Sequence, residues 1–225
     1  MMAYENYDAL IVGARCAGAA TAMLLARKGM RVLLVDRAGY GTDTVSTHAL
    51  MRGAVLQLHR WGVLPHLLEA GTPPVRSTTF HYGDEKLTVA IKPANGMDAL
   101  YAPRRALLDS TLVDAAWDAG VQVRHGQTLV RLSRRADGRV CGGTLLDAAG
   151  DVTHVTANLV IGADGAGSTV ARLVGAETLR EARHTTAVLY GYFGGREPDG
   201  EWCTGPAWRP APFRPIAVIT AFLWR

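Results

Sequence analysis

This sequence contains two glycine-rich turns whose residue types and spacing suit the binding of a charged ligand. The first reads Gly13-Ala-Arg-Cys-Ala-Gly18 and the second reads Gly162-Ala-Asp-Gly-Ala-Gly-Ser168. Each follows an apolar run that predicts a strand and precedes a run that predicts a helix. Because glycine has no side chain, the backbone N–H groups at such a turn can come close to a phosphate. Together the two turns predict a bound dinucleotide.

The first turn lies between two predicted strands. The apolar runs are Tyr7-Asp-Ala-Leu-Ile-Val12 before it and Met30-Arg-Val-Leu-Leu-Val35 after it, and the alanine- and leucine-rich segment 19–28 favours a helix. The start of that helix offers unpaired N–H donors and the positive end of the helix dipole to a doubly charged group. Asp36 ends the second strand, about 20 residues beyond the glycines, where a carboxylate suits a ribose diol.

Arg15 departs from the usual pattern of such a turn. It stands at the middle position of Gly-x-Gly-x-x-Gly, so only the first and last glycines, Gly13 and Gly18, are present. The strand, helix and strand around the turn, with Asp36 at their end, restore the specificity that this departure removes. A helix cap or a surface carboxylate is the alternative role for Asp36. An acidic residue at this position disfavours a 2′-phosphate, so NADP is not expected in this pocket.

Length and composition indicate a globular protein of one or two domains. The 225 residues are 48% hydrophobic, which is enough to bury a large core. The formal charge of +4 comes mostly from scattered arginines, so no nucleic-acid partner is expected. The 3 cysteines lack the spacing of a disulfide framework or a metal site, and Cys16 is expected to be a packing residue. Without a predicted signal peptide or membrane-spanning helix, we expect a cytoplasmic protein.

The rest of the chain predicts further helices and strands in an α/β order. They are a helical segment over 49–70 that Pro65 divides in two, a hairpin over 78–91 around Gly83-Asp84, a helix over 104–119, a parallel strand over 121–124, a hairpin over 129–146 about Asp137-Gly138, and a strand over 151–161 that enters the second glycine turn.

The second turn carries a more specific signal than the first. It joins a strand to a helix through Asp164-Gly165, with Ser168 placed to cap the helix and Arg172 one turn later. This turn resembles the Asp-Gly fingerprint of flavoprotein monooxygenases of the para-hydroxybenzoate hydroxylase type, whose fold is shared with geranylgeranyl reductases and flavin-dependent halogenases. The segment 8–18, the pair Asp36-Arg37, the run Ser46-Thr-His48 and Arg104-Arg105 are similar to the same group. The resemblance covers roughly residues 5–200 and implies FAD as the cofactor.

Carried over by position, the resemblance implies a set of cofactor-binding residues. Those expected to face the FAD pyrophosphate are Gly13, Ala14, Ala17 and Gly18, and those expected at the adenosine ribose are Asp36 and Arg37. Arg105 would lie along the pyrophosphate and ribityl chain, and the backbone of Leu129 would contact the adenine. Asp164 and Gly165 would line the junction of cofactor and reductant.

Several of these residues have simpler alternative roles. Arg105 can be a surface arginine near a helix start, and Asp164 can be a turn residue that accepts backbone N–H groups. His48 is the one histidine connected with the flavin side, and a solvated helix cap is its alternative role. No catalytic acid or base is named, because oxygen activation by a flavin does not require one.

The fold expected is an α/β, Rossmann-like FAD-binding fold with a parallel sheet, plus an incomplete antiparallel substrate-domain sheet. The FAD-binding domain is predicted to be discontinuous, over 1–75 and 101–180, and the partial substrate domain to span 76–100 and 181–204, with 78–91 and 185–193 as sheet fragments. Residues 205–225 are expected to be an atypical tail, because the prolines of 206–215 and the apolar end suit a strand poorly. The later Gly-Asp motif of the group does not follow Gly195, so we expect a C-terminally truncated member.

The function implied is that of an FAD-dependent oxidoreductase. In the group, NAD(P)H has no domain of its own and reduces the flavin, which then activates oxygen or passes hydride to an alkene. The leading expectation is an NAD(P)H-dependent monooxygenase of a small organic or aromatic substrate. The alternatives are an isoprenoid-chain reductase, an inactive nucleotide-binding remnant, and an NAD-binding regulator built on the first turn alone. Oligomeric state and substrate are not predicted.

Overall fold

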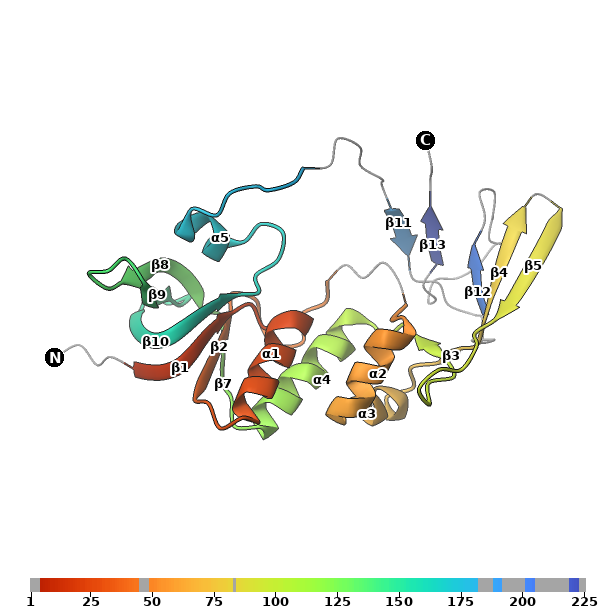
Figure 1. Ribbon diagram of the computed structural model, residues 1–225, viewed down its shortest axis with the longest axis horizontal. Coiled ribbons are helices and arrows are strands. Elements are labelled where there is room, and N and C mark those ends of the chain that lie inside the picture. Colours follow the sequence, from red (N-terminus) through yellow and green to blue (C-terminus); the bar gives the residue numbers. More distant parts are fainter. Residues whose placement is uncertain are drawn as a thin grey trace. The chain divides into compact units, whose positions relative to one another are not determined.

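The computed structural model describes residues 5–44, 49–82 and 84–181, together with the backbone of three strands at 188–191, 201–204 and 219–222 (Figure 1). The chain forms two compact units, one of residues 1–44 with 105–179 and one of residues 45–104 with 180–225. We refer to them as unit 1 and unit 2. Their borders near 44 and 104 differ from the predicted domain borders near 75 and 100, and the assignment of cofactor and substrate domains stays a prediction.

Unit 1 is built on a sheet whose strands lie in the order β7-β2-β1-β10-β9-β8. These are β1 (Glu5–Val12), β2 (Val32–Asp36), β7 (Gln122–His125), β8 (Thr128–Arg134), β9 (Val140–Leu146) and β10 (Val152–Gly162). Strands β7, β2, β1 and β10 are parallel, whereas β9 is antiparallel to both β10 and β8. The predicted α/β class with a parallel core is therefore confirmed, and the sheet as a whole is mixed.

Two helices of unit 1 pack side by side against strands of the parallel part of this sheet. They are α1 (Cys16–Ala26) and α4 (Arg105–Asp118) (Figure 1). The helix predicted over 104–119 is thereby confirmed, while α1 begins earlier than the predicted residue 19. The connection between β1 and α1 is consequently only Gly13, Ala14 and Arg15. Such a short connection places the first turn of α1 directly at the end of β1.

Apolar residues from the predicted strands form the core of unit 1. All five residues of β2 are buried, as expected for a parallel strand covered on both faces. Leu10, Leu33 and Leu145 have no exposed surface and belong to one cluster with Val155 of β10. Full burial of one such side chain contributes about 1.5–3 kcal/mol, so this cluster is a main source of the stability of unit 1.

A short helix follows β10 at the second glycine turn. This is α5 (Thr169–Val174), which contacts β8 and β10. Ser168 is its N-cap residue, and the Ser168 hydroxyl accepts a hydrogen bond of 3.0 Å from the backbone N–H of Ala171. The predicted cap is confirmed. Within the described residues, every helix falls short of the length and apolar character that crossing a bilayer requires.

In the part of the chain that the structure describes, unit 2 contains two helices and several short strands. They are α2 (Arg52–Trp61), α3 (Leu64–Glu69), β3 (Pro74–Val75), β4 (Ser77–Tyr82), β5 (Glu85–Ala90), β6 (Leu100–Tyr101), β11 (Val188–Gly191), β12 (Glu201–Thr204) and β13 (Ile219–Phe222). The predicted interruption of the helical segment exists, but Pro65 does not cause it. Helix α2 ends because Gly62 adopts a left-handed conformation with a φ of 79°, and Pro65 lies in the first turn of α3, where a missing N–H costs nothing.

The sheets of unit 2 confirm one prediction and correct another. Strands β4 and β5 form the antiparallel hairpin predicted over 78–91, and β12 joins β4 in a parallel direction. The apolar C-terminal segment, which was expected not to form a strand, contains β13, paired antiparallel with β11. Backbone pairing therefore extends further along the chain than the proline-rich stretch indicated. The remainder of segments 185–193 and 205–225 lies outside the described residues.

Candidate functional site

The carboxyl ends of the parallel strands of unit 1 meet at one edge of the sheet. Val12 at the end of β1 is level with Val35 of β2 and Gly162 of β10, and Asp36 is level with His125 at the end of β7. In open α/β sheets, ligands bind outside this edge, at the place where the strand order reverses. Strand β1 is that place here, because the chain continues from it to β2 on one side while β10 pairs with it on the other.

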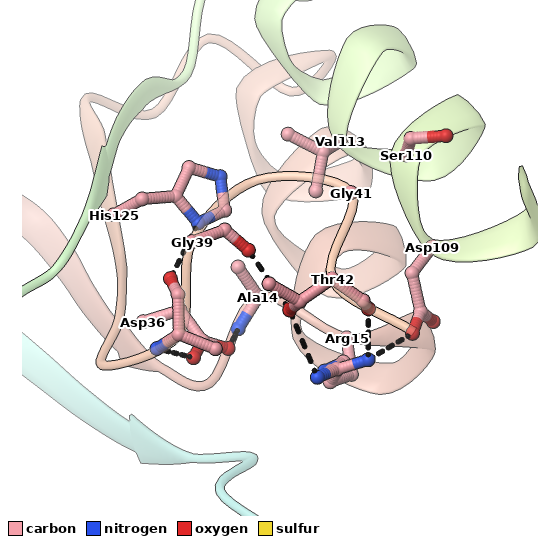
Figure 2. Close-up of a pocket in the computed structure, with 11 residues that line it drawn as sticks. Ala14, Arg15, Asp36, Gly39, Gly41, Thr42, Asp109, Ser110, Val113 and His125 are labelled. Atoms are coloured by element: carbon pink, nitrogen blue, oxygen red, sulfur yellow. Dashed lines mark hydrogen bonds and ion pairs between the residues drawn. The ribbon is translucent and has the colours of Figure 1, made fainter. Parts of the chain in front are cut away.

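A pocket lies at this edge, formed by three segments of unit 1 (Figure 2). The segments are the turn after β1, the loop after β2, and the part of the chain that includes α4 and the end of β7. The lining residues are Ala14, Arg15, Asp36, Ala38, Gly39, Gly41, Thr42, Asp109, Ser110, Val113 and His125. Of the predicted site residues, the pocket brings together Ala14 and Asp36.

Close packing explains both glycines of the first turn, because Gly13 lies against the second turn and Gly18 lies against Gly13. A Cβ atom on Gly13 would lie 2.4 Å from the carbonyl oxygen of Ala163, and Gly13 has a φ of +105°. A Cβ atom on Gly18 would lie 1.7 Å from the carbonyl oxygen of Gly13. The backbone N–H of Ala163 also donates to the carbonyl of Val12 over 2.7 Å. The glycines are thus needed for the packing of strand, turn and helix, whereas the sequence argument assigned them to close approach of a phosphate.

Asp36 is a buried carboxylate that organises the loop around it. Its Oδ2 accepts a hydrogen bond of 2.6 Å from the backbone N–H of Ala14, and its Oδ1 accepts one of 2.8 Å from the backbone N–H of Ala38 (Figure 2). One backbone donor predicted to face a pyrophosphate, that of Ala14, is therefore used within the protein. Each carboxylate oxygen can accept a second hydrogen bond, so Asp36 keeps the capacity to bind a ribose hydroxyl.

Arg15, the departure from the glycine pattern, lies in the pocket and connects its segments. Its Nη1 donates to Asp109 Oδ2 over 2.9 Å and to the carbonyl of Thr42 over 3.0 Å, and its Nη2 donates to Thr42 Oγ1 over 3.3 Å (Figure 2). The backbone of Arg15, with φ −87° and ψ −173°, is extended, a conformation that any residue adopts. The middle position of the pattern therefore does not require glycine in this turn.

Arg105 and the start of α1 converge on the same carboxylate. The Nη2 of Arg105 donates to both oxygens of Asp109 over 3.1 Å, one helical turn along α4. The backbone N–H of Cys16 and the Cys16 thiol also donate to Asp109 Oδ1, over 3.2 and 3.0 Å. Burial and the neighbouring Asp109 carboxylate raise the pKa of the Cys16 thiol to about 12. The thiol therefore stays protonated at neutral pH, as suits a packing residue.

Asp164 of the second turn acts locally. Its carboxylate accepts hydrogen bonds from the Ser168 hydroxyl over 2.5 Å and from the backbone N–H groups of Thr169 and Val170 over 2.6 and 3.2 Å. Partial burial alone would raise the pKa of this carboxyl, but the hydrogen bonds from Ser168 and the backbone outweigh it and hold the pKa below its ordinary value. These contacts match the alternative of a turn residue that accepts backbone N–H groups. Asp164 and Gly165 are not among the pocket-lining residues.

The remaining predicted residues lie outside the pocket lining. Ala17 and Arg37 are exposed. Leu129 is 3% exposed and belongs to the core cluster, so its side chain has a packing role. His48 falls outside the described residues. None of these positions tests the roles that the resemblance implied.

Sequence reasoning missed Asp109 and His125. Asp109 could have been found, because it stands four residues after Arg105 and next to Leu108 on the buried face of a predicted helix, where a carboxylate needs a partner. His125 offered no sequence signal. Its Nδ1 lies 3.1 Å from the carbonyl oxygen of Ala38, which can only accept, so Nδ1 carries the proton. The buried Nε2 has no hydrogen-bond partner among the described residues.

Comparison with known protein families decides the class of this chain. A family model described as an FAD binding domain matches residues 6–193. The chain belongs to this FAD-binding family. The resemblance predicted from the two glycine turns is thereby confirmed.

The proteins that this chain is similar to are named as different kinds of protein. The protein FixC of Escherichia coli strain K12 is 32% identical over 186 residues, which cover 77% of this chain and 40% of FixC. The menaquinone reductase of Mycobacterium tuberculosis is 31% identical over 206 residues, covering 89% of this chain and 47% of the reductase. PqsL, a probable FAD-dependent monooxygenase from Pseudomonas aeruginosa, has the same fold, with a TM-score of 0.71 at 19% identity over 84% of this chain and 50% of PqsL. The chain spans about half the length of these relatives.

The side chains near this pocket have the chemistry that the adenosine diphosphate part of FAD requires. The N-terminus of α1 and the guanidinium groups of Arg15 and Arg105 are suited to a diphosphate. Asp36 at the end of β2 is suited to a ribose diol. These groups lie at one edge of the sheet, within unit 1.

Proposed function

We propose that unit 1 binds FAD, with the diphosphate at the N-terminus of α1 and the adenosine ribose at Asp36. The observation that carries this proposal is the convergence of two guanidinium groups, a helix N-terminus and a strand-end carboxylate at one edge of the parallel sheet. Membership of the FAD-binding family supports the identity of the ligand. When bound, the flavin supplies hydride transfer, and the protein supplies binding and orientation.

Four charged side chains of unit 1 have defined tasks in this proposal. Arg15 and Arg105 would balance the charge of the diphosphate, and Arg15 would also donate hydrogen bonds to it. Asp36 would accept from a ribose hydroxyl while it holds the backbone of Ala14. Asp164 would keep the second turn in place by capping α5, without contact with the ligand.

The reaction proposed is the reduction of a small organic acceptor, with NAD(P)H as the reductant of the flavin. The menaquinone reductase among the relatives more than 30% identical favours a reductase acting on a quinone or an isoprenoid chain. Hydroxylation, the leading expectation from the sequence motifs, is the second candidate. The Asp164-Gly165 turn favours it through its resemblance to the para-hydroxybenzoate hydroxylase group.

A titration with FAD tests the first step. Purified protein is mixed with FAD while flavin fluorescence is followed, and NADH and NADPH are titrated in parallel by intrinsic tryptophan fluorescence. We expect quenching of the flavin at micromolar protein. Binding of NADH without binding of FAD would reject the proposal and favour a nicotinamide-binding regulator.

The reaction class is tested with the FAD-loaded chain. Oxidation of NAD(P)H is followed under nitrogen with a prenylated quinone, and in air with aromatic acids while oxygen is measured. Anaerobic turnover that depends on the quinone supports the reductase. Oxygen consumption coupled to a hydroxylated product supports the second candidate. Binding of FAD without turnover in either assay would identify a non-catalytic nucleotide-binding protein.

A further inference from the structure

Asp109 lines the pocket and pairs with two arginines, Arg15 and Arg105. Its side chain is 7% exposed, while those of Arg15 and Arg105 are 28% and 23% exposed. The carboxylate thus lies beneath two guanidinium groups whose outer sides reach solvent. It also accepts from the backbone N–H of Cys16 at the first turn of α1. A single buried carboxylate therefore fixes both arginines relative to the helix N-terminus.

We propose that Asp109 is a positioning residue that holds the guanidinium of Arg15 for binding the diphosphate of the cofactor. In this arrangement the Arg15 side chain binds the diphosphate. In the complete glycine pattern, backbone N–H groups that come close to the phosphate at the middle glycine would do so instead. The inference rests on the proposed FAD site, and it deepens that proposal by assigning Arg15 and Asp109, which the glycine pattern leaves without a role.

The charges of this cluster suit an anion. Two guanidinium groups and one carboxylate leave one net positive charge, next to the positive end of the α1 dipole. A buried carboxylate without a partner would be strongly destabilising, so the Asp109 pairs with Arg15 and Arg105 also stabilise the unliganded pocket. The cluster is therefore both ordered before the ligand arrives and still attractive to a doubly charged group.

The hydrogen bonds of Arg15 leave donors for a ligand. A guanidinium has five N–H donors, and within the described residues Asp109 and Thr42 use three of them. Thr42 belongs to the loop after β2, and Asp36 is the last residue of β2, so Arg15 links the diphosphate end of the pocket to the ribose end (Figure 2). Because Asp109 and Thr42 fix the side chain on two sides, little rotamer freedom would be lost on binding.

An opposite role for Asp109 is the alternative that the test must exclude. The carboxylate lies at the N-terminus of α1, where a phosphate would bind, and could act as an internal competitor that the cofactor displaces. If Asp109 is a competitor, its removal should tighten the binding of a diphosphate. If Asp109 is a positioning residue, its removal should weaken that binding.

The experiment compares a charged with an uncharged ligand on the full chain. Affinities for FAD, ADP and adenosine are measured by titration calorimetry or ligand-observed NMR for the wild type, Asp109→Asn, Asp109→Glu and Asp118→Asn. Asp118 is an exposed aspartate of the same helix, so its variant controls for the loss of one negative charge. We expect Asp109→Asn to weaken the binding of ADP and FAD by about tenfold or more, because charge-assisted contacts are lost. The binding of adenosine should weaken by less than about twofold. Asp109→Glu should recover part of the loss, and Asp118→Asn should match the wild type.

Three results would overturn the inference. They are tighter binding of ADP by Asp109→Asn, an equal loss for ADP and adenosine, and no recovery in Asp109→Glu. Failure of the wild type to bind FAD and ADP would instead remove the proposed function itself, so the two failures are distinguishable.

A second variant keeps the inference testable if Asp109→Asn does not fold. Arg15→Gly restores the complete Gly-x-Gly-x-x-Gly pattern and removes the guanidinium. If Arg15 binds the diphosphate, this variant loses about tenfold affinity for ADP at unchanged affinity for adenosine. If the glycine pattern is what matters, Arg15→Gly binds ADP as well as or better than the wild type, and the inference is wrong.

Discussion

Replacing Gly18 by alanine is the sharpest test of how the first glycine turn is packed. Gly18 is a residue of α1, and alanine is a better helix former than glycine by about 1 kcal/mol. Helix propensity alone therefore predicts that Gly18→Ala stabilises the protein. The surroundings of Gly18 predict the opposite.

The size of the destabilisation in Gly18→Ala follows from the contacts of the added methyl group. Its carbon would lie 1.7 Å from the carbonyl oxygen of Gly13 and 3.3 Å from Cβ of Ala163, where real Cβ contacts under 3.0 Å essentially do not occur. The backbone oxygen cannot rotate away as a side chain does, so α1 and the turn must separate by about 1.3 Å, a large overpacking that costs about 3 kcal/mol. After the gain in propensity, we expect a net loss of about 2 kcal/mol, or roughly 4–8 °C in the melting temperature.

The assay is thermal and urea unfolding of the FAD-free chain, followed by circular dichroism. Gly53→Ala is the matched control, because Gly53 lies in α2, is exposed, and has no atom within 4 Å of an added Cβ. The control should be as stable as the wild type or gain up to about 1 kcal/mol. If Gly18→Ala were as stable as Gly53→Ala, the close packing of α1 against the first glycine turn would be refuted.

Three further predictions concern the polar groups of unit 1. Asp36→Asn should lower the unfolding free energy by about 1–3 kcal/mol, because an amide cannot accept both backbone N–H groups that the carboxylate accepts; an unchanged urea midpoint would contradict this. The pKa of Asp164 is lowered by folding, so its contribution to stability is complete above the ordinary aspartate pKa and is lost as the pH falls through the lower pKa of the folded state; Asp164→Asn should accordingly show a weaker loss of stability than the wild type between neutral and acidic pH. The Cys16 thiol, with a pKa of about 12, should react with iodoacetamide at pH 8 far more slowly in the native protein than in urea, as measured by mass spectrometry of the Cys16 peptide, and equal rates would show that burial and Asp109 do not protect it.

The helices and strands around the site could be predicted because apolar periodicity decides them locally. The run of five buried residues in β2 and the helix over 105–118 follow directly from hydrophobic spacing and end signals. The break between α2 and α3 was predicted at the right place for the wrong reason, since both Gly62 and Pro65 are present and only the structure shows that the glycine ends the helix. The strand at β13 was missed because its pairing with β11 depends on a contact distant in sequence.

The candidate site was predictable only in part. Ala14 and Asp36 were placed together from the strand, turn and helix pattern, which is a local arrangement. Asp109 could not be joined to Arg15 from the sequence, because the pair connects residues 94 positions apart through the packing of α1 on α4. For Asp164, the family motif suggested a cofactor contact that stays a prediction, and the carboxylate caps α5 within its own turn.

These observations change which variants can report on ligand binding. Because Gly13 and Gly18 are held by contacts inside the protein, alanine at either position would disturb the turn whether or not a diphosphate binds there. A loss of FAD affinity in such a variant would therefore say nothing about contact between glycine backbone and phosphate. The guanidinium groups of Arg15 and Arg105 differ, since they reach solvent and can be changed without filling a packed gap. Evidence for the chemistry of this site must come from its charges, and the comparison of ADP with adenosine measures those charges directly.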